Sequence, residues 1–378
     1  MNQSRIFLLY PYYWPNFRAG GPSQSLFNLV GQLRDKSNFY IVSLNNDIDG
    51  SPTNPEVQLN VWQHGPNGEN VFYASSLSFF LLQRLIKEVK PDVLFVNGLF
   101  NASTTIPGII LAKYWKIKLV ISPRGMLQPW ALQQRKIIKM IFIRVIKVFL
   151  KRTETWHATD ELERTDILKN FGNNQRVHVA PNIPRRLSSL KPIEFPDKNK
   201  KIKLVFLSLI NPNKNLHLVI DAVTELSQQF SLDIYGPIAD AHYWESCKSR
   251  MVEDATITYR GGVPPWDVPT VLQQYHFFVL PTVGENFGHA IFDSLSCGVP
   301  VLISRTTPWQ DIEEKNAGYY IDSLDSGSLV SLLKRILEMN EQNYTALRMN
   351  SYEYATNYWK DSTFDKDYTF LTLPEIIF

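Results

Sequence analysis

The chain has 378 residues, of which 44% are hydrophobic, so it is long enough for two domains with sizeable cores. Its net charge of +3 is modest, and the composition does not suggest the local basic patch of a nucleic-acid-binding protein, so we expect no nucleic-acid partner. The two cysteines, Cys247 and Cys297, lie far apart without metal-ligand spacing, which excludes a disulfide framework or zinc site and favours a reducing cytoplasm.

The first half of the chain alternates short apolar runs with helical patterns. It begins without the layout of a signal peptide, and no window holds the roughly 20 uncharged apolar residues of a membrane-spanning helix. Buried strands of a parallel sheet are predicted at 5–10, 39–44, 92–98 and 118–122, with helices between them, for example at 23–34 and 76–89. This pattern predicts a Rossmann-like α/β domain over residues 1–185.

A second domain is predicted after residues 182–201, which are rich in Pro and charge and typical of a linker. The alternation restarts there, with strands predicted at 201–209, 231–236, 255–261, 276–281 and 299–304. We expect another Rossmann-like domain over residues 200–355. Because ligands bind outside the carboxyl ends of the strands in such sheets, the loops after the strands are the places to search for a site.

Two of these loops carry weak signals. The first strand is followed by "WPNFRAGGPSQSLFNLV" (14–30), in which Gly20 and Gly21 precede a helix and would let the backbone approach an anion. It lacks the spacing of a dinucleotide fingerprint, and the alternative is an ordinary tight turn. In "SLINPNKNLHLVIDAV" (208–223), Lys214 stands just before a helix, where it could meet a phosphate or simply be a solvated surface side chain.

A stronger signal is "GENFGHAIFDSLSCGVPVL" (284–302). A strand ends at Pro281, residues 282–288 form a loop, and a helix is predicted after it that runs to Cys297. Glu285 precedes this helix and Asp293 lies two turns inside it. An acid near a helix start can simply favour the positive end of the dipole, which explains Glu285 but not Asp293, because that effect fades within the first turn.

The segment 135–152 is rich in Lys and Arg and has no acid. At 100° per residue one side gathers cations and the other gathers apolar residues. The cations are Lys136, Lys139, Arg144, Lys147 and Lys151, and the apolar residues are Ile137, Ile141, Val145, Val148 and Phe149. Such a helix could lie on an anionic membrane, or it could be a domain helix that buries its apolar side and solvates its basic edge.

These residues give the whole chain a resemblance to the GT-B fold retaining glycosyltransferases of family 4, the group 1 glycosyl transferases. That family has an E-x7-E element of the form E-G-F-G-x-x-x-x-E followed by A-C-G-x-P-V, and "ENFGHAIFD" and "SCGVPVL" are similar to it. "VAPNIP" (179–184) is also placed as in the family. "SPRGMLQPWAL" (122–132) resembles a subgroup from bacterial surface-polysaccharide gene clusters.

The resemblance implies two Rossmann-like domains facing a cleft, with a C-terminal segment, 356–378, that packs back on the first domain. It implies a UDP- or GDP-sugar as donor, with Glu285 facing the sugar, Asp293 holding the ribose hydroxyls, and Lys214 and Arg124 as the other catalytic candidates. The other donor-binding candidates are Gly20, Gly21, Arg18, Asn286, Phe287, Gly288, His289, Gly236 and Val263. It implies no cofactor and no metal.

One departure from the family concerns a cation. The family usually has an Arg five residues before the Lys, where it helps neutralise the departing diphosphate, and this chain has Leu209 there. Arg18, beside the Gly-Gly loop, and Arg124, in "SPRG", are the candidates to replace it.

The function that the resemblance implies is a retaining, metal-independent hexosyltransferase of O-antigen, capsule or exopolysaccharide synthesis. It would act in the cytoplasm on a glycan acceptor, which is lipid-linked in many relatives, and could contact the inner face of the cell membrane through 135–152. One alternative is a nucleotide-sugar 2-epimerase of similar fold, which needs no acceptor. The other, motivated by Leu209, is a degenerate nucleotide-sugar-binding partner protein.

Overall fold

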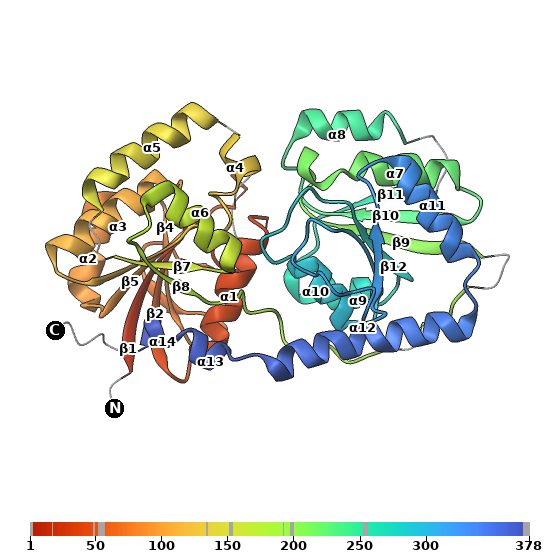
Figure 1. Cartoon of the computed structure of the whole chain (residues 1–378). Helices are drawn as coiled ribbons and strands as arrows, with labels where there is room; N and C mark the ends of the chain where they lie inside the picture. Colours follow the sequence, from red (N-terminus) through yellow and green to blue (C-terminus); the bar gives the residue numbers. More distant parts are fainter. Residues whose placement is uncertain are drawn as a thin grey trace. The chain divides into compact units, whose positions relative to one another are not determined.

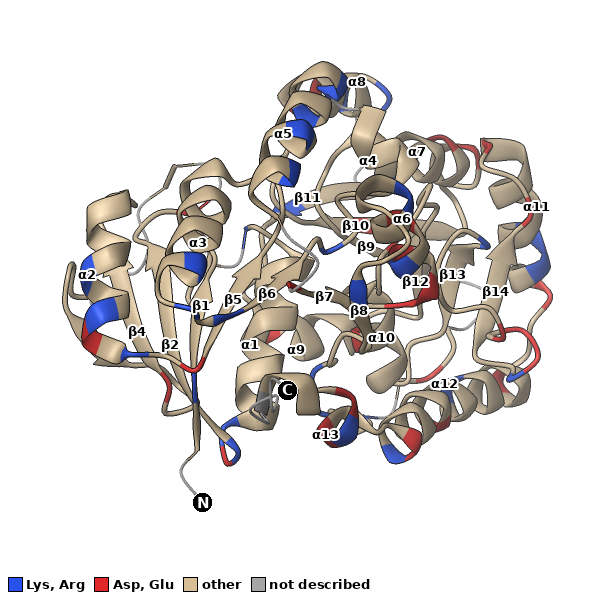
Figure 2. Cartoon of the chain, turned by 60° about the vertical axis from the view of Figure 1, so that its left-hand side comes forward, with Lys and Arg blue, Asp and Glu red and all other residues tan. Residues whose placement is uncertain are grey.

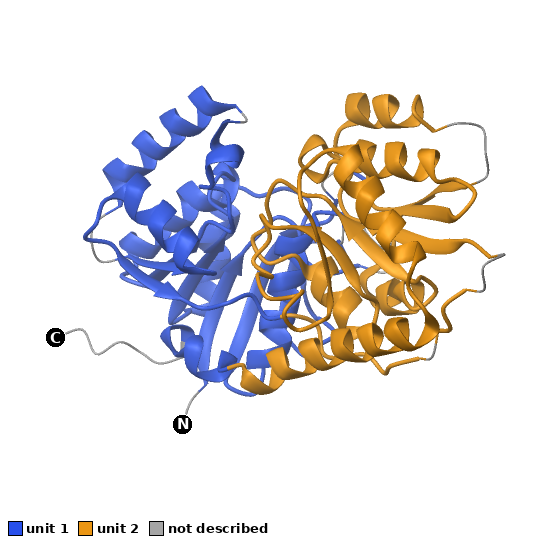
Figure 3. Cartoon of the chain, turned by 45° about the vertical axis from the view of Figure 1, so that its right-hand side comes forward, with its two compact units in different colours: residues 1–183, 363–378 blue, residues 184–362 orange. Residues whose placement is uncertain are grey.

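The chain folds into two compact units, each described by itself (Figures 1 and 3). The computed structural model describes residues 3–372 except 17, 48–49, 52–56, 134, 151–153, 192, 197–199 and 252–255. Unit 1 comprises Met1–Ile183 and Thr363–Phe378, and unit 2 comprises Pro184–Ser362. In each unit, helices flank a largely or wholly parallel sheet.

The sheet of unit 1 has eight strands in the order β3-β4-β2-β1-β5-β6-β7-β8. All neighbours are parallel except β3 and β4. The central strand β5 is buried at every position because helices cover both faces, which is why it reads as a continuous apolar run. The strands are β1 (Ser4–Leu9), β2 (Ser37–Leu44), β3 (Trp62–His64), β4 (Asn70–Ala74), β5 (Val93–Asn97), β6 (Lys118–Ser122), β7 (Thr155–Ala158) and β8 (Arg176–Val179).

The helices of unit 1 begin at recognisable signals. Ser78 accepts a hydrogen bond from the backbone N–H of Leu81 at the start of α2, and Asp160 accepts one from Glu163 at the start of α6, as N-cap residues do. The helices are α1 (Gly21–Leu33), α2 (Phe79–Val89), α3 (Ala102–Tyr114), α4 (Pro129–Gln133), α5 (Lys136–Phe149), α6 (Glu161–Phe171), α13 (Phe364–Asp367) and α14 (Thr369–Thr372).

The sheet of unit 2 has six parallel strands in the order β11-β10-β9-β12-β13-β14. The strands are β9 (Ile202–Leu207), β10 (Phe230–Tyr235), β11 (Ile257–Gly261), β12 (Phe277–Leu280), β13 (Val301–Ser304) and β14 (Gly318–Ile321). The helices are α7 (Leu216–Glu225), α8 (Ala241–Lys248), α9 (Val268–Leu272), α10 (His289–Ser296), α11 (Ser326–Leu337) and α12 (Glu341–Asp361), with short 3-10 turns η1 (Pro212–Lys214) and η2 (Pro265–Asp267).

The two predicted α/β sheets are confirmed, and so are the nine strands predicted from apolar runs, with ends shifted by at most two residues. Prediction missed β3, β4, β7, β8 and β14, which have between three and five residues each. Several of them carry polar or aromatic residues rather than a continuous aliphatic run. Such short strands take their conformation from their neighbours in the sheet more than from their own sequence.

The predicted boundaries, 1–185, 200–355 and 356–378, need correction. Residues 356–362 belong to unit 2, because α12 continues unbroken to Asp361, and only the chain from Thr363 onward returns to unit 1. The described part of the predicted linker also belongs mainly to unit 2. Arg348 on α12 donates hydrogen bonds to the carbonyls of Lys191 and Ile193, which attaches this segment to the unit.

Helix α5 exposes the apolar residues that one of the two interpretations of its sequence expected to be buried. Only Ile143 and Ile146 of this helix are buried, while Ile137, Ile141, Val145, Val148 and Phe149 are 76%, 56%, 42%, 81% and 41% exposed. The predicted burial of these particular residues is therefore wrong, and α5 packs on the core of unit 1 through Ile143 and Ile146 instead. No helix among the described residues is long and apolar enough to cross a membrane.

Lys and Arg residues are spread along the length of α5 (blue in Figure 2). Lys136, Arg144 and Lys147 are exposed. Lys139 is an exception to the predicted basic side, because its ammonium donates a hydrogen bond to the carbonyl of Ala131 at 2.6 Å, and partial burial lowers its pKa. Lys151 lies outside the described residues.

Candidate functional site

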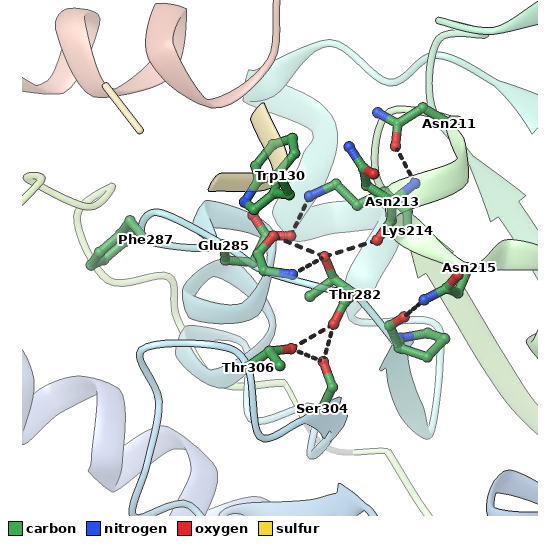
Figure 4. A network of polar contacts seen from close by, with 12 residues as sticks. Trp130, Asn211, Asn213, Lys214, Asn215, Thr282, Glu285, Phe287, Ser304 and Thr306 are labelled. Carbon is green, nitrogen blue, oxygen red and sulfur yellow. Dashed lines mark hydrogen bonds and ion pairs between the residues drawn. The ribbon is translucent and has the colours of Figure 1, made fainter. Parts of the chain in front are cut away.

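Two loops at the carboxyl ends of neighbouring strands in unit 2 bring a cation and an acid together. Lys214 ends the turn η1 after β9, and Glu285 lies in the loop after β12, the strand that pairs with β9. The Lys214 ammonium forms an ion pair and hydrogen bond with the Glu285 carboxylate (Figure 4). Both side chains are mostly buried, with 14% and 15% of their surface exposed.

The backbone of these two loops is joined by hydrogen bonds. The N–H of Val283 donates to the carbonyl of Asn213 at 2.9 Å, and the side-chain amide of Asn215 donates to the carbonyl of Pro281 at 2.8 Å. Asn211 accepts a hydrogen bond from the N–H of Asn213 and so shapes the turn. The positions of Lys214 and Glu285 are therefore set by their backbones before any ligand binds.

Thr282 connects the same loops to the next strand. Its hydroxyl donates to the carbonyl of Gly284 at 2.9 Å, and its own carbonyl accepts hydrogen bonds from the hydroxyls of Ser304 and Thr306 (Figure 4). Thr282 is fully buried, and Ser304 ends β13. The loop of Glu285 is thus fixed by hydrogen bonds to residues at or just after the ends of both neighbours of β12, namely β9 and β13.

Helix α10 begins just after this ion pair. Its N-cap, Gly288, has φ +79°, and a Cβ there would lie 2.8 Å from the Ile291 side chain, so the position requires glycine. No side chain caps this helix start in the described chain, and a helix start of this kind binds anions through its first N–H groups.

The residues between the two acids have different surroundings. Phe287 packs its ring against Trp309 and Phe292 in the core, and its carbonyl accepts a hydrogen bond from the Trp309 indole at 2.7 Å. Its side chain is therefore engaged in core packing, and only its backbone is left to contact a nucleotide sugar. Asn286 and His289 are half-buried, and the His289 ring lies 4.8 Å from the Phe287 ring.

Asp293 is buried, with 5% exposure, and faces an arginine that sequence reasoning did not consider. Its Oδ1 lies 3.5 Å from Nε of Arg185. Burial raises the pKa of the Asp293 carboxyl, and the charge of Arg185 lowers it in opposition. Nothing in the local sequence links these two residues, which lie far apart along the chain.

Gly236 and Val263 have structural explanations of their own. A Cβ at Gly236 would lie 1.8 Å from the carbonyl oxygen of Ser208, so glycine lets the chain after β10 pass close to the loop after β9. Val263 is partly buried and packs against the core of unit 2. Both lie in loops at the carboxyl edge of the sheet, and their role in binding a donor stays a prediction.

The Gly-Gly loop lies at the carboxyl end of β1 in unit 1. Gly20 is the N-cap of α1 with φ +74°, and Gly21 is the first residue of the helix. Arg18 is fixed beside it, because its backbone N–H donates to Asp47 at 2.9 Å and its guanidinium to the hydroxyl of Ser51 at 3.3 Å.

Arg124 is nearly buried within unit 1, with 6% exposure. Its Nε donates to the side chain of Asn97, the last residue of β5, at 2.7 Å, and its Nη1 donates to the side chain of Asn182 at 2.5 Å. Asn182 belongs to "VAPNIP", so this motif orients Arg124. Sequence reasoning singled out both segments but did not predict that they meet.

The predicted residues therefore form separate groups. Within unit 2, Lys214 contacts Glu285, whereas Asp293 pairs with Arg185. Within unit 1, Arg18 and Arg124 are held by different partners. Sequence reasoning missed Arg185 and Thr282, because a single Arg or Thr in a loop carries no periodic or motif signal.

Sequence comparison assigns both halves of the chain. Residues 19–183 match the profile of Glycosyltransferase Family 4, and residues 191–357 match that of Glycosyl transferases group 1. The chain is 26% identical over 140 residues to O-antigen chain mannosyltransferase B of Escherichia coli, a match that spans 35% of this chain and 36% of that enzyme. It is 19% identical over 306 residues to an uncharacterized 41.2 kDa protein in the cps region of Klebsiella pneumoniae, covering 76% of this chain and 83% of that one.

Solved structures share the fold over nearly the whole chain. HepE of Anabaena, in complex with UDP-glucose, aligns with a TM-score of 0.68 at 15% identity, covering 94% of this chain and 95% of that one. This likeness establishes the architecture of two Rossmann-like domains. With the two profile matches, it shows that the chain belongs to the group 1 glycosyltransferases and is a glycosyltransferase of the GT-B fold.

Proposed function

We propose that this glycosyltransferase transfers a hexosyl residue from a UDP- or GDP-sugar to a glycan acceptor in bacterial surface-polysaccharide synthesis, with retention of configuration. The observation that carries the proposal is the ion pair of Lys214 and Glu285 beside the start of α10, at the carboxyl edge of the sheet of unit 2. The names of the O-antigen and cps-region relatives support the pathway, and the UDP-glucose complex of HepE supports a nucleotide-sugar donor.

The chemistry follows from the charges. As the bond between the anomeric carbon and the diphosphate breaks, negative charge grows on the leaving oxygen, where Lys214 and the N–H groups of α10 would stabilise it. Glu285 would accept hydrogen bonds from the sugar hydroxyls. The diphosphate would take the proton of the acceptor hydroxyl as that oxygen bonds to the anomeric carbon on the same face. These positive groups would let the reaction proceed without a metal ion or a cofactor.

We also propose that unit 1 binds the acceptor and contacts an anionic lipid surface through α5. The supporting observation is the exposed apolar side of α5, with Ile137 and Val148 the most exposed, bordered by Lys136, Arg144 and Lys147. A basic strip beside an exposed apolar side is the pattern of a helix that lies in the interface of a bilayer. A lipid-linked acceptor at the cytoplasmic face would then reach the enzyme from that surface.

The experiment that tests the function is a panel of UDP- and GDP-sugars, assayed with and without glycan acceptors and with a chelator in parallel. Transfer that survives the chelator is the expected result. Interconversion of donor sugars without acceptor would instead support a 2-epimerase. Binding without turnover would support a degenerate binding protein, the alternative that Leu209 favours.

A further inference from the structure

We propose that Arg185 is a donor-binding residue whose guanidinium contacts the diphosphate of the nucleotide sugar. The inference rests on the proposed function and adds to it a residue that no motif identifies. Arg185 lies two residues after the last residue of unit 1 and belongs to unit 2, so all its contacts below lie within one unit.

The position of Arg185 is defined by three groups. Its Nε lies 3.5 Å from Oδ1 of Asp293 on α10, and its Nη1 donates to the carbonyl of Pro265 in the loop after β11. Its own carbonyl accepts a hydrogen bond from the indole of Trp359 at 2.9 Å. The guanidinium is thus placed between α10 and the β11 loop, both at the carboxyl edge of the sheet.

The distance from the helix start favours a phosphate contact. Asp293 is four residues beyond His289, about 6 Å along the axis of α10 at ~1.5 Å per residue. A diphosphate at the start of α10 would therefore lie within reach of a long side chain that is anchored beside Asp293. Arginine binds phosphate oxygens in paired hydrogen bonds, which lysine cannot do with its single ammonium.

The negative charge of the proposed ligand favours a second cation in the site. A nucleoside diphosphate is strongly anionic, and Lys214 is shared with Glu285 in the donor-free chain. Arg185 is likewise shared with a carboxylate, and its side chain is 18% exposed, so a ligand that enters the site can reach it. Lys214, paired with Glu285 just before α10, and Arg185, paired with Asp293 within α10, would bind the phosphates together.

The test is to measure the binding of UDP, GDP, uridine and guanosine to the full chain by calorimetry. Arg185→Gln should weaken the binding of the diphosphate that the wild type prefers by about 10-fold or more, the effect of losing one charged hydrogen bond. It should leave nucleoside binding unchanged, and Arg185→Lys should restore part of the loss. Arg186→Gln is the matched control, because Arg186 is adjacent and exposed.

Arg185→Gln leaves Asp293 buried without its cation, so a second comparison guards against a folding defect. The double variant Arg185→Gln/Asp293→Asn should bind the diphosphate about 10-fold more weakly than Asp293→Asn alone. Equal loss for nucleoside and diphosphate, or no loss at all, would overturn the inference while the proposed function stands. Failure of the wild type to bind either diphosphate would overturn the proposed function and the inference with it.

Discussion

At the residue scale, Lys214 and Glu285 neutralise each other in the donor-free chain, and each has a different task in the proposed reaction. The pair is mostly buried, and its loops are fixed by Thr282, Asn213 and Asn215. Preorganised charges of this kind need no rearrangement when negative charge develops on the leaving group. In the proposed reaction, contacts with the donor would replace the mutual contact of the two side chains.

We predict that Lys214→Met and Glu285→Gln each reduce turnover at least about 100-fold, because each removes a charged contact to the transition state. Steady-state rates with the best donor of the panel give the measurement, and circular dichroism checks the fold. The control pair is Lys334→Met and Glu225→Gln, which removes an exposed ion pair of the same unit and should leave turnover unchanged. Turnover within a few-fold of wild type in either site variant would remove that residue from the mechanism.

The Asp293 carboxyl makes the stability of the folded chain depend on pH. Burial raises the pKa of its carboxyl above the ordinary value, so the folded chain holds this proton more tightly than the unfolded chain. The stability that depends on Asp293 is therefore full below its unfolded pKa and is lost as the pH rises through the folded pKa. Arg185 opposes this loss, because its charge favours the ionised carboxylate.

Arg185→Gln should therefore destabilise the chain more at about pH 8 than at about pH 5. In acid the Asp293 carboxylate, which has lost its cation in this variant, is more readily neutralised by a proton. Thermal unfolding at the two pH values measures the difference from wild type. Adding Asp293→Asn should abolish the pH dependence of that difference. An equal loss of stability at both pH values would show that the charge of Asp293 is not what Arg185 compensates.

At the element scale, the strands that are predicted most directly are those buried on both faces and therefore almost wholly apolar, such as β5 and β12. The polar contacts of the site could not be predicted in the same way. Lys214 and Glu285 were each expected at a strand end, but their contact depends on β9 and β12 being neighbours, although β10 and β11 lie between them in the sequence. Similarly, the ion pair of Asp293 with Arg185 exists only once α10 packs in the folded unit.

For α5, we predict binding to vesicles that contain anionic lipid and none to neutral vesicles. Each exposed cation near anionic lipid contributes about 1 kcal/mol, so changing Lys136, Arg144 and Lys147 to Gln should weaken binding by more than about 10-fold. Sedimentation with vesicles provides the measurement. Binding of the wild type should also fall steeply with salt, because salt screens the surface potential.

The apolar side of α5 is tested separately. Changing Ile137 and Val148 to Ser should also weaken vesicle binding, because it removes apolar surface from the interface. Two controls match these changes: Leu162→Ser alters an exposed apolar residue on α6, and Arg84→Gln/Lys87→Gln/Lys90→Gln removes three exposed cations on or next to α2. A wild type that ignores anionic vesicles, or controls that lose as much binding as the α5 variants, would contradict the membrane proposal.

At the scale of the whole molecule, the chain leaves unit 1 after Ile183 and returns to it after Ser362. The returning segment is attached by aromatic residues. Tyr368 lies edge-on to the fully buried His157, and Phe370 stacks on His178 with ring centroids 4.9 Å apart. The Tyr368 hydroxyl also donates to the carbonyl of Pro181 at 3.0 Å. The last described residues therefore complete the packing of unit 1 beside β7 and β8.

This arrangement predicts that Phe370→Ala destabilises unit 1 by about 3 kcal/mol, the usual cost of removing a buried aromatic ring. Donor binding should stay close to that of the wild type, because the donor site is proposed to lie mainly in unit 2, whose core does not include Phe370. Denaturant unfolding gives the stability, calorimetry with the preferred nucleotide gives the affinity, and Lys366→Ala is the control, since Lys366 is exposed in the same segment. If Phe370→Ala unfolded as the wild type does, the segment would be a passive tail. If it lost stability and nucleotide affinity together, the two units would not be energetically separable, because damage confined to unit 1 would have reached the donor site.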